Sequence, residues 1–123
     1  MSAQFELIKS QRLVILTLEG SVNLAELEST GVLILAHPDF EPNFSQIIDC
    51  TRLGGVNFSV DTIRRISRDE KTFSPTAMRI IVAPQDHIYG LARMAQVFAE
   101  RTIPNMVVVR TMDEAREALN KAK

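Results

Sequence analysis

Hydrophobic residues along the chain alternate between the spacing of strands and the spacing of helices. Residues 5–10 and 13–19 are extended segments separated only by Gln11 and Arg12, which predicts a tight hairpin, and Gly20 ends the second segment. After this hairpin, short apolar strands alternate with amphipathic helices. The strands are expected over residues 45–51, 78–83 and 105–110, and the helices over 23–36, from 59 onward, over 86–101 and from 111 onward.

Strands that alternate with helices form a parallel sheet through right-handed crossovers. The antiparallel hairpin at the front makes this sheet mixed. The sequence therefore predicts an α/β fold with a mixed, mostly parallel five-stranded sheet and four or more helices, in the order β-β-α-β-α-β-α-β-α. We expect a single domain over residues 1–123, because no repeat, low-complexity tract or internal linker interrupts the pattern.

Capping residues mark the starts of three helices. Asn23, Ser59 and Thr111 each precede a helical pattern and carry a side-chain oxygen that can accept a hydrogen bond from a free backbone amide. Glu26 and Glu114 lie three residues after Asn23 and Thr111, which is the spacing of a capping box.

The first predicted helix is apolar on more than one side. Its residues at core-facing spacing are Leu24, Leu27, Gly31, Ile34 and Leu35. Leu33 lies on the opposite side and Val32 lies well off this stripe. A helix that is apolar nearly all round is covered on both sides. Three coverings remain open: a neighbouring loop, a subunit contact or an apolar ligand.

The segment from 45 to 68 combines a strand, a loop containing Gly54 and Gly55, and a capped helix. In open parallel sheets, the loops after the strands carry the ligand or partner site. Asp49, Cys50 and Thr51 end this strand, and His87 follows the next one, so these four residues mark a candidate loop edge.

This placement would allow a nucleophilic set of Cys50, His87 and Asp86. Two observations argue against it, since single cysteines usually behave as buried hydrophobes and no nucleophile elbow is present. We therefore predict no catalytic residue, an inert thiol at Cys50, and no enzyme activity.

Charge and composition narrow the function further. The 14 basic and 15 acidic residues give a net charge of -1, so no positive field favours nucleic acid. The single cysteine suits a reducing compartment, no secretory signal or transmembrane segment is visible, and a cytoplasmic location is expected. His37 and His87 are not at metal-binding spacing, and neither a metal nor a cofactor is predicted.

The third predicted helix carries a second unusual surface. Gly90 lies early in it, where glycine lowers helix stability, and close approach by a neighbouring backbone or a ligand would account for it. Met94 flanks the core stripe and Val97 lies opposite. One interpretation is an ordinary surface with a stray valine. The other interpretation is an adaptable apolar surface that spans the first and third helices. Its members are Val32, Leu33, Tyr89, Gly90, Met94 and Val97.

The opening extended pair, the strand ending Asp49-Cys50-Thr51 and the capped helix at Ser59 resemble the STAS domains, the SpoIIAA-like fold of bacterial anti-sigma-factor antagonists. Small stand-alone bacterial SpoIIAA-like proteins are more similar still. Like them, the chain has Tyr-Gly-Leu-Ala-Arg-Met at 89–94 after a strand ending Val-Ala-Pro, and a valine-rich strand followed by Glu-Ala. The resemblance implies a non-enzymatic regulatory or protein-interaction module. The fold also resembles the CRAL-TRIO lipid carriers.

The start of the second helix departs from the pattern of the kinase-regulated antagonists. These carry Asp-Ser-Ser-Gly there, with the second serine phosphorylated, whereas this chain has Asn57-Phe58-Ser59-Val60. Ser59 keeps the hydroxyl at the helix N-terminus and stays a candidate phosphosite. Because Asp61 would repel added negative charge, a plain N-cap is the favoured interpretation.

Three hypotheses remain, in this order. The first is a STAS-like interaction module that forms a homodimer or binds an unknown protein. The alternative is a carrier of a small apolar or lipid-like molecule, held between the first and third helices and the sheet. A cysteine-dependent enzyme is a distant third.

Overall fold

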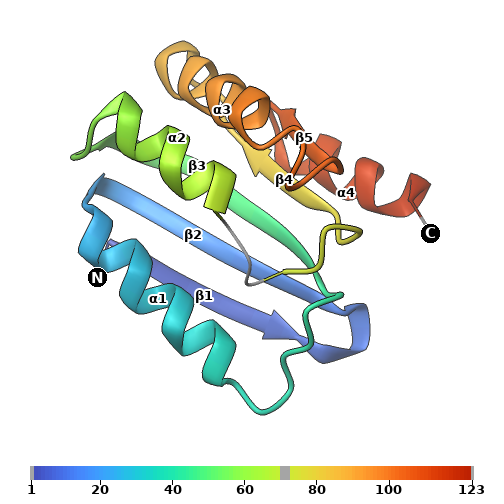
Figure 1. Ribbon diagram of the computed structural model, residues 1–123. Coiled ribbons are helices and arrows are strands. Elements are labelled where there is room, and N and C mark those ends of the chain that lie inside the picture. The colour runs from blue at the N-terminus through green and yellow to red at the C-terminus, as the bar shows by residue number, and fades with distance from the viewer. Residues whose placement is uncertain (1, 70–72, 123) are drawn as a thin grey trace.

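The computed structural model describes residues 2–69 and 73–122 of the chain and contains the predicted succession of elements (Figure 1). Their bounds are β1 (Ala3–Ile8), the short 3-10 helix η1 (Lys9–Gln11), β2 (Leu13–Val22), α1 (Leu24–Ala36), β3 (Ser45–Val56), α2 (Val60–Asp69), β4 (Arg79–Val82), α3 (Asp86–Phe98), β5 (Met106–Val109) and α4 (Met112–Lys121). The predicted α/β class and the alternating order are confirmed.

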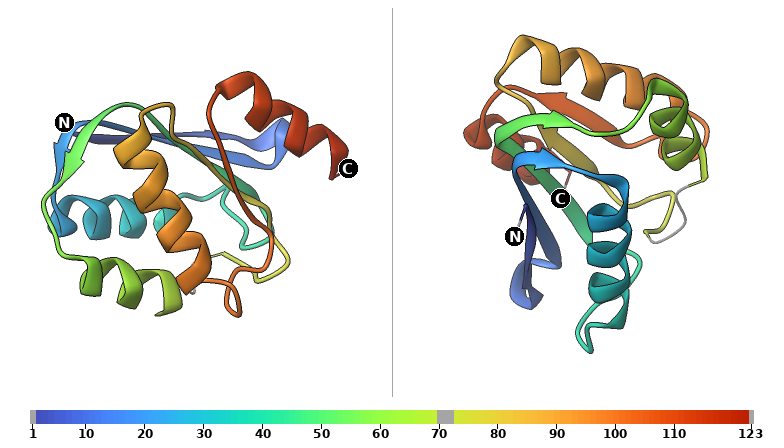
Figure 2. Two further views of the ribbon diagram at one scale, coloured as in Figure 1. Left: turned by 90° about the horizontal axis from the view of Figure 1, so that it is seen from above. Right: turned by 90° about the vertical axis from the view of Figure 1, so that its left-hand side faces the viewer.

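The five strands form one sheet in the order β1-β2-β3-β4-β5. β1 is antiparallel to β2, and all later neighbours are parallel. Each parallel strand is added beside the previous one, so right-handed crossovers leave the three connecting helices on the same face. Figure 2 shows this arrangement, with α1, α2 and α3 on one face of the sheet and α4 on the other.

Alternate strand residues pack on opposite faces of the sheet, which explains why its strands are apolar on both sides. The buried cluster under α4 consists of Leu13, Ile47, Ile80, Val82 and Ala115. The larger cluster on the other face includes Leu16, Leu18, Cys50, Ile81, Ile88 and Ala92. Neighbouring residues such as Ile47 and Ile48 therefore pack on opposite faces of the sheet.

The hairpin differs in detail from its prediction. Lys9 and Ser10 do not extend the first strand but belong to η1, and Arg12 takes a left-handed conformation with φ 51°. Gly20 does not end the second strand, because β2 continues to Val22. Gly20 adopts φ 64° at an irregularity in the β2–β3 register, a conformation that glycine adopts without strain.

The predicted glycine loop at Gly54 and Gly55 was wrong, because both residues lie inside β3. The extended β2 provides the pairing partner, with Gly20 opposite Leu53 and Val22 opposite Val56. A Cβ atom added to Gly54 would lie 3.4 Å from the carbonyl oxygen of Gly20. Close approach of two strands therefore explains a glycine here.

Two strands and one helix are shorter than the sequence predicted. β4 and β5 are shorter than the expected 78–83 and 105–110, and α3 ends at Phe98 where helix was expected to 101. Ala99 and Ile103 in the turn after α3 are both buried. Because they continue the apolar spacing of the helix, the sequence pattern cannot mark where the helix stops.

The capping predictions are confirmed, one of them in part. The Asn23 side chain accepts a hydrogen bond from the Glu26 amide at 2.9 Å, which is one half of a capping box. Thr111 and Glu114 form the complete box. The Ser59 hydroxyl accepts a hydrogen bond from the Thr62 amide at 3.2 Å.

Replacing Ser59 with alanine should lower the free energy of unfolding by about 1 kcal/mol, because the Thr62 amide loses its capping acceptor. Ser59→Asp is the matched control, since aspartate supplies an acceptor at the same place and should retain most of the stability. Urea unfolding of both variants measures the difference. A Ser59→Ala midpoint equal to that of the parent chain would contradict the capping role.

Candidate functional site

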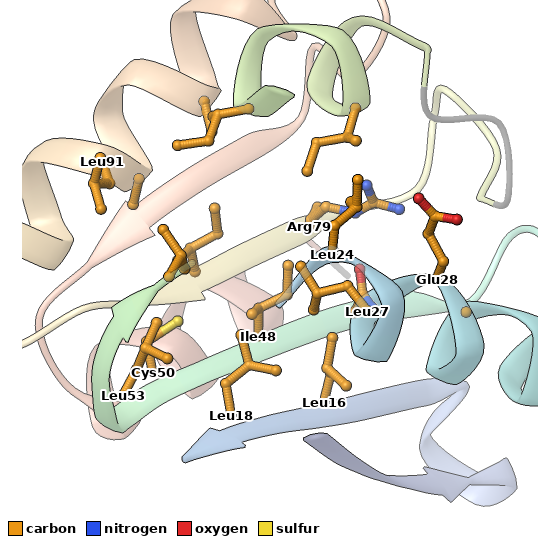
Figure 3. A pocket seen from close by; sticks show the side chains of 18 of the residues that line it. Leu16, Leu18, Leu24, Leu27, Glu28, Ile48, Cys50, Leu53, Arg79 and Leu91 are labelled. Atoms are coloured by element: carbon orange, nitrogen blue, oxygen red, sulfur yellow. The ribbon is translucent and has the colours of Figure 1, made fainter. Parts of the chain in front are cut away.

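A largely apolar cavity of about 480 Å³ lies between the three crossover helices and the sheet (Figure 3). The sheet contributes Leu16, Leu18, Gln46, Ile48, Cys50, Leu53, Val56, Arg79, Ile81 and Met106. The helices and connections contribute Leu24, Leu27, Glu28, Gly31, Val32, Ile34, Leu35, Phe58, Ile63, Ile66, Phe73, Ile88, Leu91, Ala92, Ala95 and Ile103.

The floor of the cavity follows from the two-residue period of the strands. Leu16 and Leu18 on β2, Ile48 and Cys50 on β3, and Ile81 on β4 all point to the face that carries the crossover helices. These side chains make a continuous apolar surface across the centre of the sheet.

The walls come from helices that pack against different neighbours. α1 is anchored over the hairpin side, where Ile34 packs with Val14 and Phe44. α2 and α3 are in contact, with the Arg64 guanidinium 4.9 Å from the centre of the Phe98 ring. Gly31 enlarges the space on the α1 side, because a Cβ atom added there would meet nothing within 4 Å.

Leu35 was predicted to face the core, and this was wrong, because its side chain is 58% exposed. It lines the cavity at the surface, as does Val32. Thr30, which the apolar stripe omitted, is buried instead, with its hydroxyl donating to the Glu26 carbonyl oxygen at 2.8 Å. The edge of the cavity on α1 is therefore formed by exposed apolar residues.

One end of the cavity is polar. Gln46 and Arg79 are buried, 5% and 6% exposed, and face each other in the register of β3 and β4. The Cζ atom of Arg79 lies 4.7 Å from the centre of the Phe73 ring, a cation–π arrangement. Glu28 on α1 is exposed, and Figure 3 shows its carboxylate and the Arg79 guanidinium pointing toward the same end.

The predicted loop edge does not assemble a nucleophilic set among the described residues. The His87 Nε2 atom lies 3.1 Å from the Gly54 carbonyl oxygen, and Asp86 pairs with Arg110 at 2.8 Å. Asp49 accepts a hydrogen bond from the Thr51 amide at 3.0 Å. Over the described ranges, no three His, Cys, Asp or Glu side chains group as metal ligands.

Cys50 lies in the wall of the cavity, where its thiol is buried. Burial, and to a smaller extent the nearby Asp49 carboxylate, raise the pKa of Cys50 to about 12. The thiol is therefore protonated near neutral pH, and the nucleophilic thiolate is scarce.

The predicted apolar surface lies on two helices. Val32, Leu33 and Val97 are 65%, 55% and 63% exposed, and Met94 is half-buried. Val32 lines the cavity, whereas Leu33 does not. That these residues act together remains a prediction.

Tyr89 and Gly90 have separate surroundings. The Tyr89 ring lies beneath Arg110, whose Cζ atom is 3.8 Å from the ring centre. Gly90 is exposed, and a Cβ atom added there meets nothing within 4 Å. The predicted close approach of a neighbouring backbone at Gly90 was therefore wrong among the described residues. Ser59 is exposed and acts as the helix cap, and its use as a phosphosite remains a prediction.

Gln46 and Arg79 are the residues that sequence reasoning missed. Both lie near the starts of the predicted strands 45–51 and 78–83, but neither was singled out as a site residue. The available signal was that Arg79 lies inside the apolar run 78–83, a pattern typical of a strand that is covered on both faces. A charged residue at such a position is unusual and indicates a site.

Comparison with solved structures identifies the fold. The chain is similar to an uncharacterised protein of the DUF3478 family from Shewanella loihica PV-4, described as having a SpoIIAA-like fold, with a TM-score of 0.62. The two share 18% sequence identity over 95% of this chain and 91% of that one. No protein-family model matches the chain, and no curated protein matches it either.

The chain therefore has a SpoIIAA-like fold, as its sequence predicted. In the described part of the chain, no helix is both long and apolar enough to cross a membrane.

The Cys50 thiol should react slowly with iodoacetamide near neutral pH in the native protein, because its raised pKa keeps it protonated. Unfolding in urea should restore ordinary reactivity. His87→Ala should leave the native rate unchanged, since His87 contacts the Gly54 carbonyl instead. Mass spectrometry of timed samples measures the rate, and fast native labelling that disappears in His87→Ala would overturn this assignment.

Proposed function

We propose that the chain binds a small apolar or lipid-like molecule in the cavity beneath α1, α2 and α3, without catalysing its conversion. The observation that carries this proposal is the cavity itself. Its volume of about 480 Å³ lies within the range of roughly 300–1,000 Å³ that is typical of small-molecule sites. A predominantly apolar lining with a few convergent polar groups is also typical of such sites.

The hydrophobic effect favours an occupant. The cavity is open to solvent beside Val32 and Leu35, and an occupant would remove its apolar lining from contact with water. Water is a poor filler here, because an ordered water needs two to four polar partners and most of the lining is aliphatic. An apolar ligand would bury this surface at about 25 cal/mol per Å².

Binding without turnover is supported by the chemistry of the lining. The only thiol of the sequence, Cys50, has a raised pKa, and neither His37 nor His87 lines the cavity. General acid–base catalysis needs a group that titrates near the working pH within reach of the substrate. The described lining offers an exposed carboxylate, a buried amide and a guanidinium.

A second candidate function rests on the exposed apolar residues of α1. Val32 and Leu35 are exposed at the edge of the cavity and Leu33 is exposed outside it, and exposed apolar residues close together favour a partner surface. This feature suits a STAS-like interaction module that pairs with a second copy of the chain or with another protein. Leu33 distinguishes the two functions, because it belongs to this surface but not to the cavity lining.

Filling the cavity should abolish ligand uptake. Gly31→Leu places a side chain into the cavity, where an added Cβ meets nothing within 4 Å, so the variant should fold and exclude a ligand. Nile red, a neutral dye whose fluorescence rises in apolar surroundings, serves as the probe. The parent chain should show saturable uptake of Nile red, and Gly31→Leu should show little.

Two controls accompany this experiment. Gly31→Ala raises helix propensity by about 1 kcal/mol and barely changes the space, so it should still bind the dye. Gly90→Leu makes the same chemical change at an exposed helical glycine outside the lining and should also bind normally. Absence of saturable uptake by the parent chain, or equal uptake by Gly31→Leu, would contradict the cavity as a binding site.

Leu33→Asp should dissociate a homodimer while leaving Nile red uptake intact, because Leu33 is exposed on α1 and lies outside the cavity lining. Ser29→Asp, at another exposed position of α1, introduces the same charge without removing an apolar side chain. Sedimentation velocity measures the association state. A parent chain that sediments as a monomer, or a dimer unaffected by Leu33→Asp, would refute this contact.

A further inference from the structure

We infer that the ligand of this cavity is an uncharged amphiphile whose polar group both donates and accepts a hydrogen bond, as an alcohol or a primary amide does, and that the Gln46 side chain binds this group. The inference rests on the proposed function and adds the chemical class of the ligand and the residue that selects it.

Gln46 is a buried polar residue on the apolar floor of the cavity. It is 5% exposed and lies on β3, where it points to the same face of the sheet as Ile48 and Cys50. Its register partners are Val14 on β2 and Arg79 on β4. Because β3 is the middle strand of the sheet, the Gln46 amide lies at the centre of the face that carries the crossover helices.

The side-chain amide of Gln46 has no hydrogen-bond partner within the described part of the chain. The backbone amide of Gln46 donates to the Met78 carbonyl oxygen at 2.9 Å, but no described group bonds to the side-chain oxygen or nitrogen. Buried polar groups are normally hydrogen-bonded, because a buried amide without a partner is destabilising. A ligand in the cavity would supply the missing partner.

The charges of the cavity favour an uncharged ligand. The charged side chains of the described lining are Arg79 and Glu28, so its formal charge sums to zero. The Arg79 guanidinium is also held against the Phe73 ring, 4.7 Å from the ring centre. An ion is unfavourable in apolar surroundings unless an opposite charge compensates it. A neutral molecule brings no charge that this lining would have to compensate.

The chemistry of a glutamine amide selects the polar group of the ligand. The side chain of Gln46 offers N–H donors and a carbonyl acceptor on one planar group. A hydroxyl or a primary amide can accept from the N–H group and donate to the carbonyl oxygen. An ether can only accept, so it leaves the carbonyl oxygen of Gln46 without a partner.

The tail of the ligand has an apolar lining toward the carboxyl end of β3. Cys50 and Leu53 lie further along β3 than Gln46, and Leu91 comes from α3. Figure 3 shows Cys50, Leu53 and Leu91 on the far side of the cavity from Arg79, the register partner of Gln46. The ligand therefore lies along β3, with its polar group at Gln46 and its tail toward Leu53.

Displacement of Nile red by two isomers tests the polar group on the unaltered chain. Decanol and 1-methoxynonane contain the same atoms, but only decanol has a hydroxyl donor. Decanol should displace the dye at about fivefold lower concentration, the effect of one additional hydrogen bond. Equal displacement by the two would overturn the role of the Gln46 amide and leave the cavity proposal intact. Displacement by neither would contradict the proposed function itself.

Two charged analogues of decanol test whether the ligand is neutral. Decanoate and decylammonium have the same kind of tail with a negative or a positive head group. Each should require at least about tenfold higher concentration than decanol to displace the dye. An ion of either sign that displaces Nile red as well as decanol does would overturn the assignment of an uncharged ligand.

Gln46→Met removes the amide and keeps the length of the side chain. This variant should take up Nile red but lose the preference for decanol over 1-methoxynonane, and a persisting preference would place the polar group elsewhere. Its urea midpoint should be no lower than that of the parent chain, because the amide has no described protein partner to lose. A lower midpoint would contradict an unsatisfied amide at Gln46.

Gln96→Met is the matched control, because the Gln96 amide has a partner and lies outside the cavity lining. It donates to the Met106 carbonyl oxygen at 2.9 Å. Gln96→Met should therefore lower the urea midpoint and keep the preference for decanol. Loss of this preference in both variants would overturn the assignment to Gln46.

Discussion

The direction in which strands are added to the sheet is the constraint on which the rest of this structure depends. From β2 to β5, each new parallel strand lies beside the last on the same side. Right-handed crossovers then leave α1, α2 and α3 on one face, and only α4, which follows the last strand, covers the other. α4 closes its face with a compact cluster around Ile47 and Ile80. On the crowded face, α1 packs toward the hairpin and α2 packs against α3, which leaves the cavity between them.

The register of the strands gives this cavity its polarity. α/β proteins commonly bind ligands at the carboxyl ends of parallel strands. Here the buried polar pair Gln46 and Arg79 lies where β3 and β4 begin, and the carboxyl-terminal half of β3 contributes Cys50 and Leu53 instead. The buried polar residues of the cavity therefore lie at the opposite end of the strands from the usual ligand site of α/β proteins.

Local signals were sufficient to predict the order of elements and the helix starts. Ser59 and Thr111 cap helices because their side chains satisfy backbone amides a few residues away, an interaction contained in the local sequence. Features that depend on distant partners were not predictable in this way. Gly54 resembled a loop residue because the backbone that it approaches, at Gly20 on β2, lies far away in the chain. Leu35 also matched the spacing of core residues. Helical periodicity does not show how far away the neighbouring helix lies, however, and the Leu35 side chain lines an open cavity.

An isoleucine-methyl NMR titration with Nile red would test most directly the claim that the cavity beneath α1, α2 and α3 binds an apolar molecule, because isoleucines line both faces of the sheet. Ile48, Ile81 and Ile88 belong to the cavity, whereas Ile47 and Ile80 are packed under α4. We expect saturable chemical-shift changes for the methyl groups of Ile48, Ile81 and Ile88 and little change for those of Ile47 and Ile80. Equal shifts on both faces, or none on either, would contradict it.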